Sequence, residues 1–132
     1  MDTADRSLTA LAGRVKMAFG TGDSDSFREL LDPGVHWGPP GDPSPPCQNR
    51  EQVIAWYERA KDAGASAVVS EVSVVGDRIV VGLVVAWTGG ARARGGHATR
   101  WQVLSVANGR IADIVGFEEK QEALAWVEAQ PG

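Results

Sequence analysis

The chain has 132 residues, of which 43% are hydrophobic and 23% are charged. This size suits one globular domain, and the composition is too apolar for a disordered chain. The formal net charge of -4 leaves no basic surplus to neutralise phosphates, which disfavours nucleic-acid binding. We therefore expect a single domain over residues 1–132 whose partners are small molecules or proteins.

The cysteine and histidine content argues against a metal site. One cysteine and two histidines leave no metal-ligand spacing and no internal disulfide, so we predict no metal and no cofactor. No apolar run approaches the roughly 20 residues of a transmembrane helix, and the acidic, polar start differs from a signal peptide. These features predict a cytoplasmic protein without membrane contact.

A helical pattern opens the chain. From Leu8 to Phe19 the apolar residues recur every three or four positions, which is typical of the buried face of an amphipathic helix. Gly20 and Gly22 should end this helix. The next segment carries a possible cap followed by apolar positions, which predicts a second, short helix before Pro33.

A brief strand and a third helix follow. The stretch VHW predicts the strand, and the helix is expected from about residue 50 to residue 63. Asn49 and Gln52 form a capping-box pattern at the start of this helix, and Gly64 should end it. The apolar side of the helix carries Val53, Trp56, Tyr57 and Ala60.

The second half of the chain has the pattern of strands. SAVVSEVSVVGDRIVVGLVVAWTGG predicts two strands joined at Gly76 and Asp77, and HATRWQVLSVANGRIADIVGF predicts two more around an Asn-Gly turn. The chain closes with EEKQEALAWVEAQ, whose acidic first turn favours a helix. Three helices, four antiparallel strands and a final helix predict an α+β fold.

One strand suggests how the sheet is covered. IVVGLVVAW, residues 79–87, is apolar at both odd and even positions, whereas a sheet with one solvated face would alternate. Helices can cover one face, and a second copy of the sheet can cover the other. We therefore expect a homodimer through the convex face of the sheet. The alternative is the central, buried strand of a monomer.

The order of these elements resembles the nuclear transport factor 2-like superfamily. FGTGDSDSFRELLDPGVHW is similar to its opening, CQNREQVIAWYERA resembles the third helix of its SnoaL-like, polyketide-cyclase-related branch, and RWQVLSVANGRIADIVGF resembles its closing hairpin. The resemblance implies a cone-shaped, curved antiparallel sheet wrapped around three N-terminal helices, with a C-terminal helix. It also implies an apolar cavity for oxygenated ligands such as steroids and polyketides, but no single reaction.

Three catalytic arrangements of this superfamily are missing at the matching positions. Its isomerases end the first strand with an aspartate base, where this sequence has Trp37. Their oxyanion-binding tyrosine corresponds to Val15, and an aspartate of the epoxide hydrolases corresponds to Gly116. The sequence argues against each of these reactions and leaves open whether the protein is an enzyme.

Polar residues of the last hairpin are the main candidates for ligand contact. The resemblance fixes a register in which Arg100 and Gln102 share the concave face with Leu104. An unpaired guanidinium inside an apolar cone is costly, so Arg100 should meet either Glu71 or another protein carboxylate, or an anionic ligand group. Gln102 can orient a carbonyl or a water, or be ordinary polar filling. Glu71 is the best remaining candidate for a general base with a raised pKa.

The other groups that could react are expected to be quiet. His36 and His97 should be exposed or at the rim of the cavity. Asp113 should lie on the convex face with Ile111, where a carboxylate serves the dimer contact better than the cavity. Cys47 precedes a helix, yet the sequence places no histidine to activate it, so we expect a half-buried thiol that does not react.

Aromatic residues are expected around the cavity. On the geometry of the family, Trp37, Trp56 and Tyr57 should contact the ligand, together with Leu104 and Gly116. The other three tryptophans should pack in the core or in the dimer interface. The stiff, proline-rich stretch GPPGDPSPP should cross the open end of the cone and shape access to the cavity without supplying a base.

Two functions fit these residues. In the first, an enzyme of the isomerase, cyclase or hydrolase type acts on an apolar oxygenated metabolite, with Arg100 stabilising a developing negative charge, Gln102 orienting it and Glu71 as the base. In the second, a non-catalytic domain binds a carboxylate-bearing ligand through Arg100. A third, weaker alternative is a protein-interaction module with a filled cavity.

Overall fold

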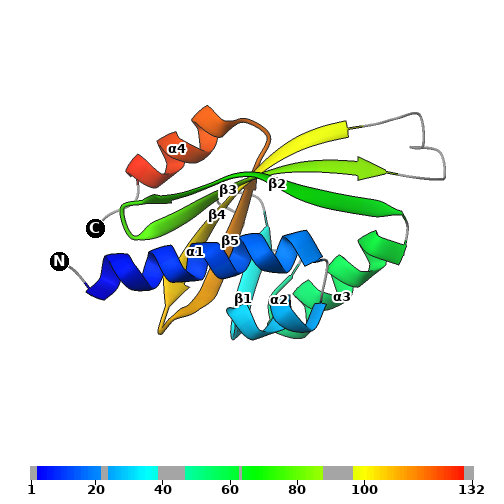
Figure 1. The fold of residues 1–132 in the computed structure, drawn as a ribbon, viewed down its shortest axis with the longest axis horizontal. Helices are drawn as coiled ribbons and strands as arrows, with labels where there is room; N and C mark the ends of the chain where they lie inside the picture. Colours follow the sequence, from blue (N-terminus) through cyan, green and yellow to red (C-terminus); the bar gives the residue numbers. More distant parts are fainter. Residues whose placement is uncertain (1–2, 22–23, 39–46, 63, 88–96, 130–132) are drawn as a thin grey trace.

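The computed structural model describes residues 3–21, 24–38, 47–62, 64–87 and 97–129 (Figure 1). Four helices and five strands make up this part of the chain. The helices are α1 (Thr3–Thr21), α2 (Ser24–Leu30), α3 (Arg50–Asp62) and α4 (Lys120–Ala129). The strands are β1 (Leu31–Gly38), β2 (Ala65–Val75), β3 (Arg78–Trp87), β4 (His97–Ala107) and β5 (Arg110–Phe117). The predicted α+β class and the predicted order of elements are confirmed.

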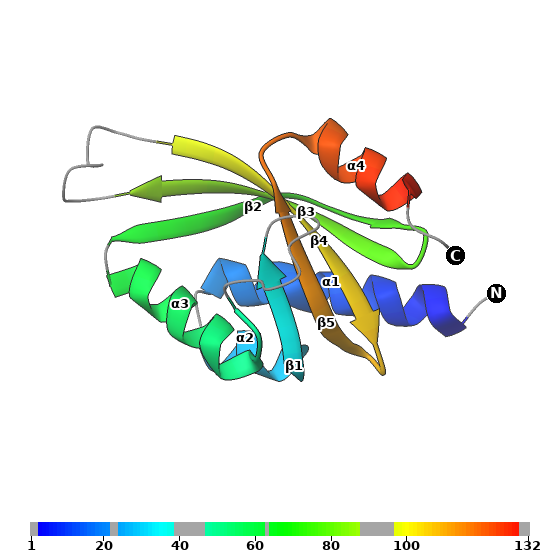
Figure 2. The same cartoon turned by 180° about the vertical axis from the view of Figure 1, so that it is seen from behind.

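The five strands form one sheet in the order β1-β5-β4-β3-β2. The pairs from β2 to β5 are antiparallel, as predicted, but β1 runs parallel to β5, so the sheet is mixed (Figure 2). β1 is also longer than the predicted VHW, because it begins at Leu31 and includes Pro33. A proline is tolerated here because β1 is an edge strand with an irregular register between Leu31 and His36.

Local sequence signals at the β4–β5 turn and around α3 act as expected, whereas α1 continues past Gly20 to Thr21. Asn108 and Gly109 both have positive φ, 53° and 78°, which suits the tight turn of the β4–β5 hairpin. At the start of α3, the Gln52 backbone N–H donates to Asn49 Oδ1 at 2.9 Å, and Gln52 Oε1 accepts a bond from the backbone of Gln48 at 2.7 Å. Gly64, two residues beyond the end of α3, has a φ of 92°, and its backbone N–H donates to the backbone oxygen of Lys61 at 2.9 Å.

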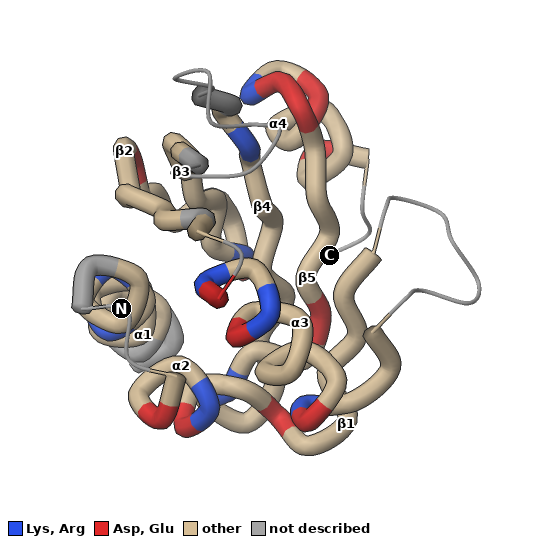
Figure 3. The backbone as a smooth tube through the Cα atoms, turned by 90° about the vertical axis from the view of Figure 1, so that its right-hand side faces the viewer, with Lys and Arg blue, Asp and Glu red and all other residues tan. Residues whose placement is uncertain are grey.

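Helices cover the two faces of the sheet unequally. α1, α2 and α3 lie on the concave side and α4 lies on the convex side (Figure 1). The larger core fills the concave side, and a smaller one under α4 contains Val80, Val103, Ala123 and Val127. The helices carry most of the charged residues and the strands carry few (Figure 3). None of the described helices is long and apolar enough to span a membrane.

A bulge corrects one predicted orientation. The sequence alternation placed Ile111 on the convex face with Asp113, but Ile111 is fully buried in the concave core. The register of β4 and β5 shifts at this point, so that one extra residue of β5 reverses the alternation. Asp113 does lie on the convex row, because it pairs with Ser105.

α4 accounts for part of the apolar pattern of β3. Val80 is 1% exposed because it packs under α4 with Val103. The two-sided apolar character of this strand therefore has a source within one chain. Farther along the same face, Val68 of β2 pairs with Val84 and is 65% exposed. A homodimer through this face stays a prediction.

Candidate functional site

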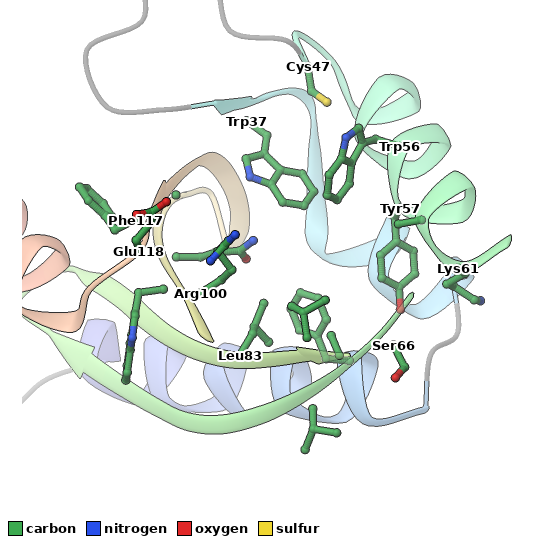
Figure 4. A pocket seen from close by; sticks show the side chains of 18 of the residues that line it. Trp37, Cys47, Trp56, Tyr57, Lys61, Ser66, Leu83, Arg100, Phe117 and Glu118 are labelled. Atoms are coloured by element: carbon green, nitrogen blue, oxygen red, sulfur yellow. The ribbon is translucent and has the colours of Figure 1, made fainter. Parts of the chain in front are cut away.

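A cavity of about 840 Å³ lies between the concave face of the sheet and α3 (Figure 4). Its described lining is mostly apolar and rich in aromatic side chains, and it reaches the surface beside exposed Trp56 and Lys61. This size is in the range of natural small-molecule sites. The residues that decide its chemistry are Trp37, Cys47, Trp56, Tyr57, Lys61, Leu83, Arg100, Gln102, Gly116 and Glu118.

Trp37 and Trp56 form one wall of the cavity. Their ring centroids are 4.7 Å apart with the planes inclined at 63°, and one ring comes from β1 and the other from α3. Backbone hydrogen bonds between Trp37 and Cys47, at 2.9 and 3.2 Å, fix the end of β1 against the start of the α3 region. The proline-rich stretch between them, residues 39–46, lies outside the described residues, so its role at the rim stays a prediction.

β4 supplies the two polar groups on the floor of the cavity. Arg100 pairs with Leu83, Gln102 with Val81 and Leu104 with Ile79. All three partners are buried in the concave core, so the predicted alternation along β4 is confirmed. Arg100 extends from the sheet into the space between Trp37 and Leu83 (Figure 4).

Among the described residues, Gln102 is the one polar residue that is buried. It is 7% exposed and lines the cavity, yet no described residue hydrogen-bonds its side-chain amide. The amide atoms are not among the fully enclosed side-chain atoms that lack a partner, so they are open to the cavity. A donor and an acceptor are thus held ready in an apolar surrounding.

Arg100 is more accessible than Gln102. Its Nη1 donates to the backbone oxygen of Thr99 at 3.1 Å, and within the described ranges no carboxylate forms an ion pair with it. Of the two alternatives for Arg100, the internal pair with Glu71 is excluded, because Glu71 pairs with Lys120. Arg100 is exposed and lines the cavity, so its remaining N–H groups are accessible to a ligand.

Gly116 keeps space open above Gln102. The two residues pair across the β4–β5 ladder, and a Cβ on Gly116 would meet no atom within 4 Å. Tyr57 also lines the cavity, where its ring packs 5.2 Å from Phe27. Leu104 does not contact the cavity, because it is 1% exposed within the closed core. The prediction that Leu104 contacts ligand is wrong.

Glu71 is outside the cavity. The register of β2 shifts between Val69, which pairs with Leu83, and Glu71, which pairs with Gly82, so the alternation is reversed and Glu71 lies on the convex face. There Lys120 Nζ of α4 is 2.7 Å from Glu71 Oε2. The hydrogen bond from Lys120 lowers the pKa of Glu71, which is the opposite of the raised pKa expected for a general base. Glu71 is not placed to act on a ligand in the cavity.

The remaining candidates also lie where they have little access to the cavity. His36 is exposed on β1 beside Asp113, and the side chain of His97 is outside the described part of the chain. Desolvation raises the pKa of Asp113 on the convex face, against the opposing charges of His36 and Arg78. Cys47 is 5% exposed, and burial raises the pKa of its thiol, as expected of an unreactive cysteine.

Sequence reasoning missed two charged residues of the lining. Glu118 follows β5, two residues after Gly116. It is the one carboxylate among the described residues that line the cavity. Lys61 is near the end of α3, with its Nζ 5.5 Å from the centre of the Tyr57 ring. The sequence did contain a signal for both. Glu118 is two residues after Gly116 and Lys61 is four residues after Tyr57, and Gly116 and Tyr57 were both predicted to line the cavity. In the described part of the chain no group of three potential ligands could hold a metal ion.

Comparison with known proteins gives one family. Residues 14–114 match the model of the SnoaL-like domain. No curated protein is similar enough in sequence to match this chain. The family match covers more than half of the chain, and it includes β1, α3 and the strands that build the cavity floor.

Solved structures share the fold at low sequence identity. A proposed polyketide cyclase from Xanthomonas campestris pv. campestris is 19% identical with a TM-score of 0.70, over 95% of this chain and 99% of the other. Bal32a, from a soil-derived mobile gene cassette, is 20% identical with a TM-score of 0.71, over 92% and 96%. An uncharacterised cystatin-fold protein from Novosphingobium aromaticivorans is 11% identical with a TM-score of 0.69, over 82% and 95%. At these identities the likeness shows the fold alone.

Proposed function

The chain belongs to the SnoaL-like domain family, and from that premise we propose that it binds a small, mostly apolar, oxygenated molecule in the cavity between the sheet and α3. The family supports a small-molecule-binding domain at the level of the fold. The proposal for this chain is carried by one observation, the unpartnered amide of Gln102 in an apolar cavity.

An amide on the apolar wall of a cavity contributes less to packing than an apolar side chain would. A leucine at this position would pack with Val81 and Leu83 and bury more apolar surface. An oxygen of a ligand would satisfy the donor of Gln102, and the apolar remainder of the ligand would fill the space beside the tryptophan pair. Polar groups few in number and fixed in position are what set orientation in such sites.

A cavity-blocking variant tests the proposal. Gly116→Leu adds a side chain where nothing lies within 4 Å, and Gly116 does not have a positive φ, so the backbone accepts the change. The new side chain would cover Gln102 and fill part of the cavity. We expect Nile red, a neutral apolar dye, to bind the original protein with increased fluorescence and to bind Gly116→Leu at least tenfold more weakly.

The matched control is Gly13→Leu. Gly13 lies on the exposed side of α1, also with no atom within 4 Å of a new Cβ, and it is far from the cavity lining. Dye binding should be unchanged in this variant. Equal dye binding by Gly116→Leu and the original protein would overturn the proposal, and would favour the alternative of a protein-interaction module.

Catalysis of a reaction on the bound molecule is a more specific alternative to binding alone. Isomerase, cyclase or hydrolase chemistry by proton transfer would use Glu118, because this carboxylate lines the described cavity, with Arg100 and Gln102 stabilising negative charge. Turnover of cyclic ketones or epoxides that is lost in Glu118→Gln would establish it. Saturable binding without product favours the non-catalytic domain.

Two further features of the proposal come from the sequence. The 65% exposure of Val68 on the convex face supports a homodimer through that face, and its test is the mass of the particle in solution. We also keep the prediction of a cytoplasmic protein that needs neither metal nor cofactor and binds neither nucleic acid nor membrane. The net charge of -4 supports the expectation for nucleic acid.

A further inference from the structure

We infer that the ligand of this cavity is a hydroxy or keto carboxylic acid on a flat, mostly apolar frame, whose carboxylate binds Arg100 and whose second oxygen binds Gln102. The inference rests on the proposed function and adds the chemical class of the ligand. Three features of the cavity lead to it: the free donors of Arg100, the free amide of Gln102 and the aromatic wall that faces them.

The first feature is a cation that no carboxylate of the described residues neutralises. Among the described residues, the one hydrogen bond of the Arg100 guanidinium goes to the backbone oxygen of Thr99. A guanidinium has several further N–H groups in a planar fork, which matches the two oxygens of a carboxylate. The described charged lining also contains Lys61 and Glu118, so cations outnumber anions at the mouth of the cavity. An anionic ligand group is favoured there over a cationic one.

The second feature is the position of Gln102 relative to Arg100. The two residues are separated by one position on the same face of β4, so their Cα atoms lie about 7 Å apart. A single small molecule can therefore reach both. Gln102 is the deeper of the two, 7% exposed, and its amide suits a neutral carbonyl or hydroxyl, because it can both donate and accept.

The third feature is the shape of the apolar space. Trp37 and Trp56 stand together across from Leu83, and Arg100 extends into the space between (Figure 4). Aromatic walls favour flat ligands, since ring faces and edges pack well against a planar frame. A planar acid with its frame beside Trp37 would bring its carboxylate to Arg100 at the accessible end and its other oxygen toward Gln102.

Three commercial probes separate these contributions. Hydroxynaphthoic acid carries both oxygen functions, its methyl ester lacks the charge, and naphthoic acid lacks the hydroxyl group. Isothermal titration calorimetry of the complete protein should show the hydroxy acid binding at least tenfold more tightly than the ester. It should also bind about threefold to tenfold more tightly than naphthoic acid.

Single variants assign each preference to its residue. Arg100→Gln should remove the preference for acid over ester and leave the affinity for the ester within about twofold. Gln102→Leu should remove the preference for the hydroxy acid over naphthoic acid and keep the preference for acid over ester. The matched controls are Arg110→Gln at the start of β5 and Gln121→Leu on α4, both exposed and outside the lining, and both should retain every preference.

The outcomes distinguish this inference from the proposed function. Equal affinity of the original protein for acid and ester would overturn the carboxylic acid class and leave small-molecule binding standing. The same holds if Arg100→Gln keeps the preference for the acid. Failure of all three probes to bind, together with failure of Nile red, would overturn both. A preference lost in Arg100→Gln and kept in Arg110→Gln would support the inference.

Discussion

The concave face of the sheet is packed solid at one end and hollow at the other. At the packed end, Ile79 of β3 and Leu104 of β4 are at most 1% exposed within the concave core. At the hollow end, the same two strands present Leu83 and Gln102, while β5 contributes Gly116, which has no side chain. The strands continue without a break from one end to the other, so the difference comes from side chains. Small and polar residues such as Gly116 and Gln102 leave a cavity where larger apolar side chains would fill the core.

The largest expected effect compares one residue type at the two ends. Leu104→Ala should lower the free energy of unfolding by about 3–4 kcal/mol, because it leaves a sealed void in the packed end. Leu83→Ala should cost about 2 kcal/mol, because it enlarges a cavity that is already open to water. Urea denaturation of both variants measures the difference. Equal losses would mean that the hollow end is as tightly packed as the other.

The second prediction concerns the cost of the site. Gln102→Leu should raise the free energy of unfolding of the unliganded protein by up to about 1 kcal/mol, since it puts an apolar side chain in place of an amide that no described residue hydrogen-bonds. The same change should weaken ligand binding, which is the trade-off expected of a functional residue. Gln121→Leu on α4 is the exposed control and should change stability little. A destabilised Gln102→Leu protein would show that Gln102 is structural.

The concave side was predictable from the sequence wherever the signal is local. The hydrophobic period of α1, the cap at Asn49 and the turn at Asn108 and Gly109 each depend on a few neighbouring residues, and each was predicted. The alternation along β4 was also predicted, and the family resemblance, not the local pattern, indicated that Arg100 and Gln102 lie on the concave face. Those signals do not need knowledge of which strands pair.

What the sequence did not predict depends on pairing between distant segments. The parallel pairing of β1 with β5 joins the two halves of the chain, and no local pattern indicates it. Two bulges had a larger effect on the site. One extra residue in β2 turned Glu71 to the convex face, and one in β5 turned Ile111 to the concave core. The alternation of side chains along a strand does not indicate where a bulge will occur. The sequence therefore placed Glu71, the proposed base, on the wrong face of the sheet.

On the convex face, the contribution of Asp113 to stability should depend on pH. Desolvation raises the pKa of Asp113 above its value in the unfolded chain, so the ionised carboxylate destabilises the fold at neutral pH. This penalty disappears as the pH falls through the folded pKa toward the unfolded value of about 3.9. Asp113→Asn should therefore stabilise the protein at neutral pH by less than about 1 kcal/mol, because the group is half-exposed and screened.

Thermal denaturation as a function of pH checks this sign. The advantage of Asp113→Asn should be greatest at neutral pH and should vanish near about pH 3, where both proteins carry a neutral group. The charges of His36 and Arg78 oppose the desolvation of Asp113. A loss of stability in Asp113→Asn at neutral pH would mean that those charges outweigh desolvation. It would also strengthen the case for a charged contact on this face.

The smallest expected effect separates Glu71 from the cavity. The hydrogen bond from Lys120 lowers the folded pKa of Glu71, so its contribution to stability is present above the unfolded pKa of about 4.3 and is lost as the pH falls through the folded pKa. Both side chains are exposed, so Glu71→Gln should lower the Tm only slightly at neutral pH. Binding of Nile red and of hydroxynaphthoic acid should not change, because the bulge in β2 directs this carboxylate to the other face of the sheet. A large loss of binding in Glu71→Gln would contradict this register, and would return Glu71 to the list of groups that act on the ligand.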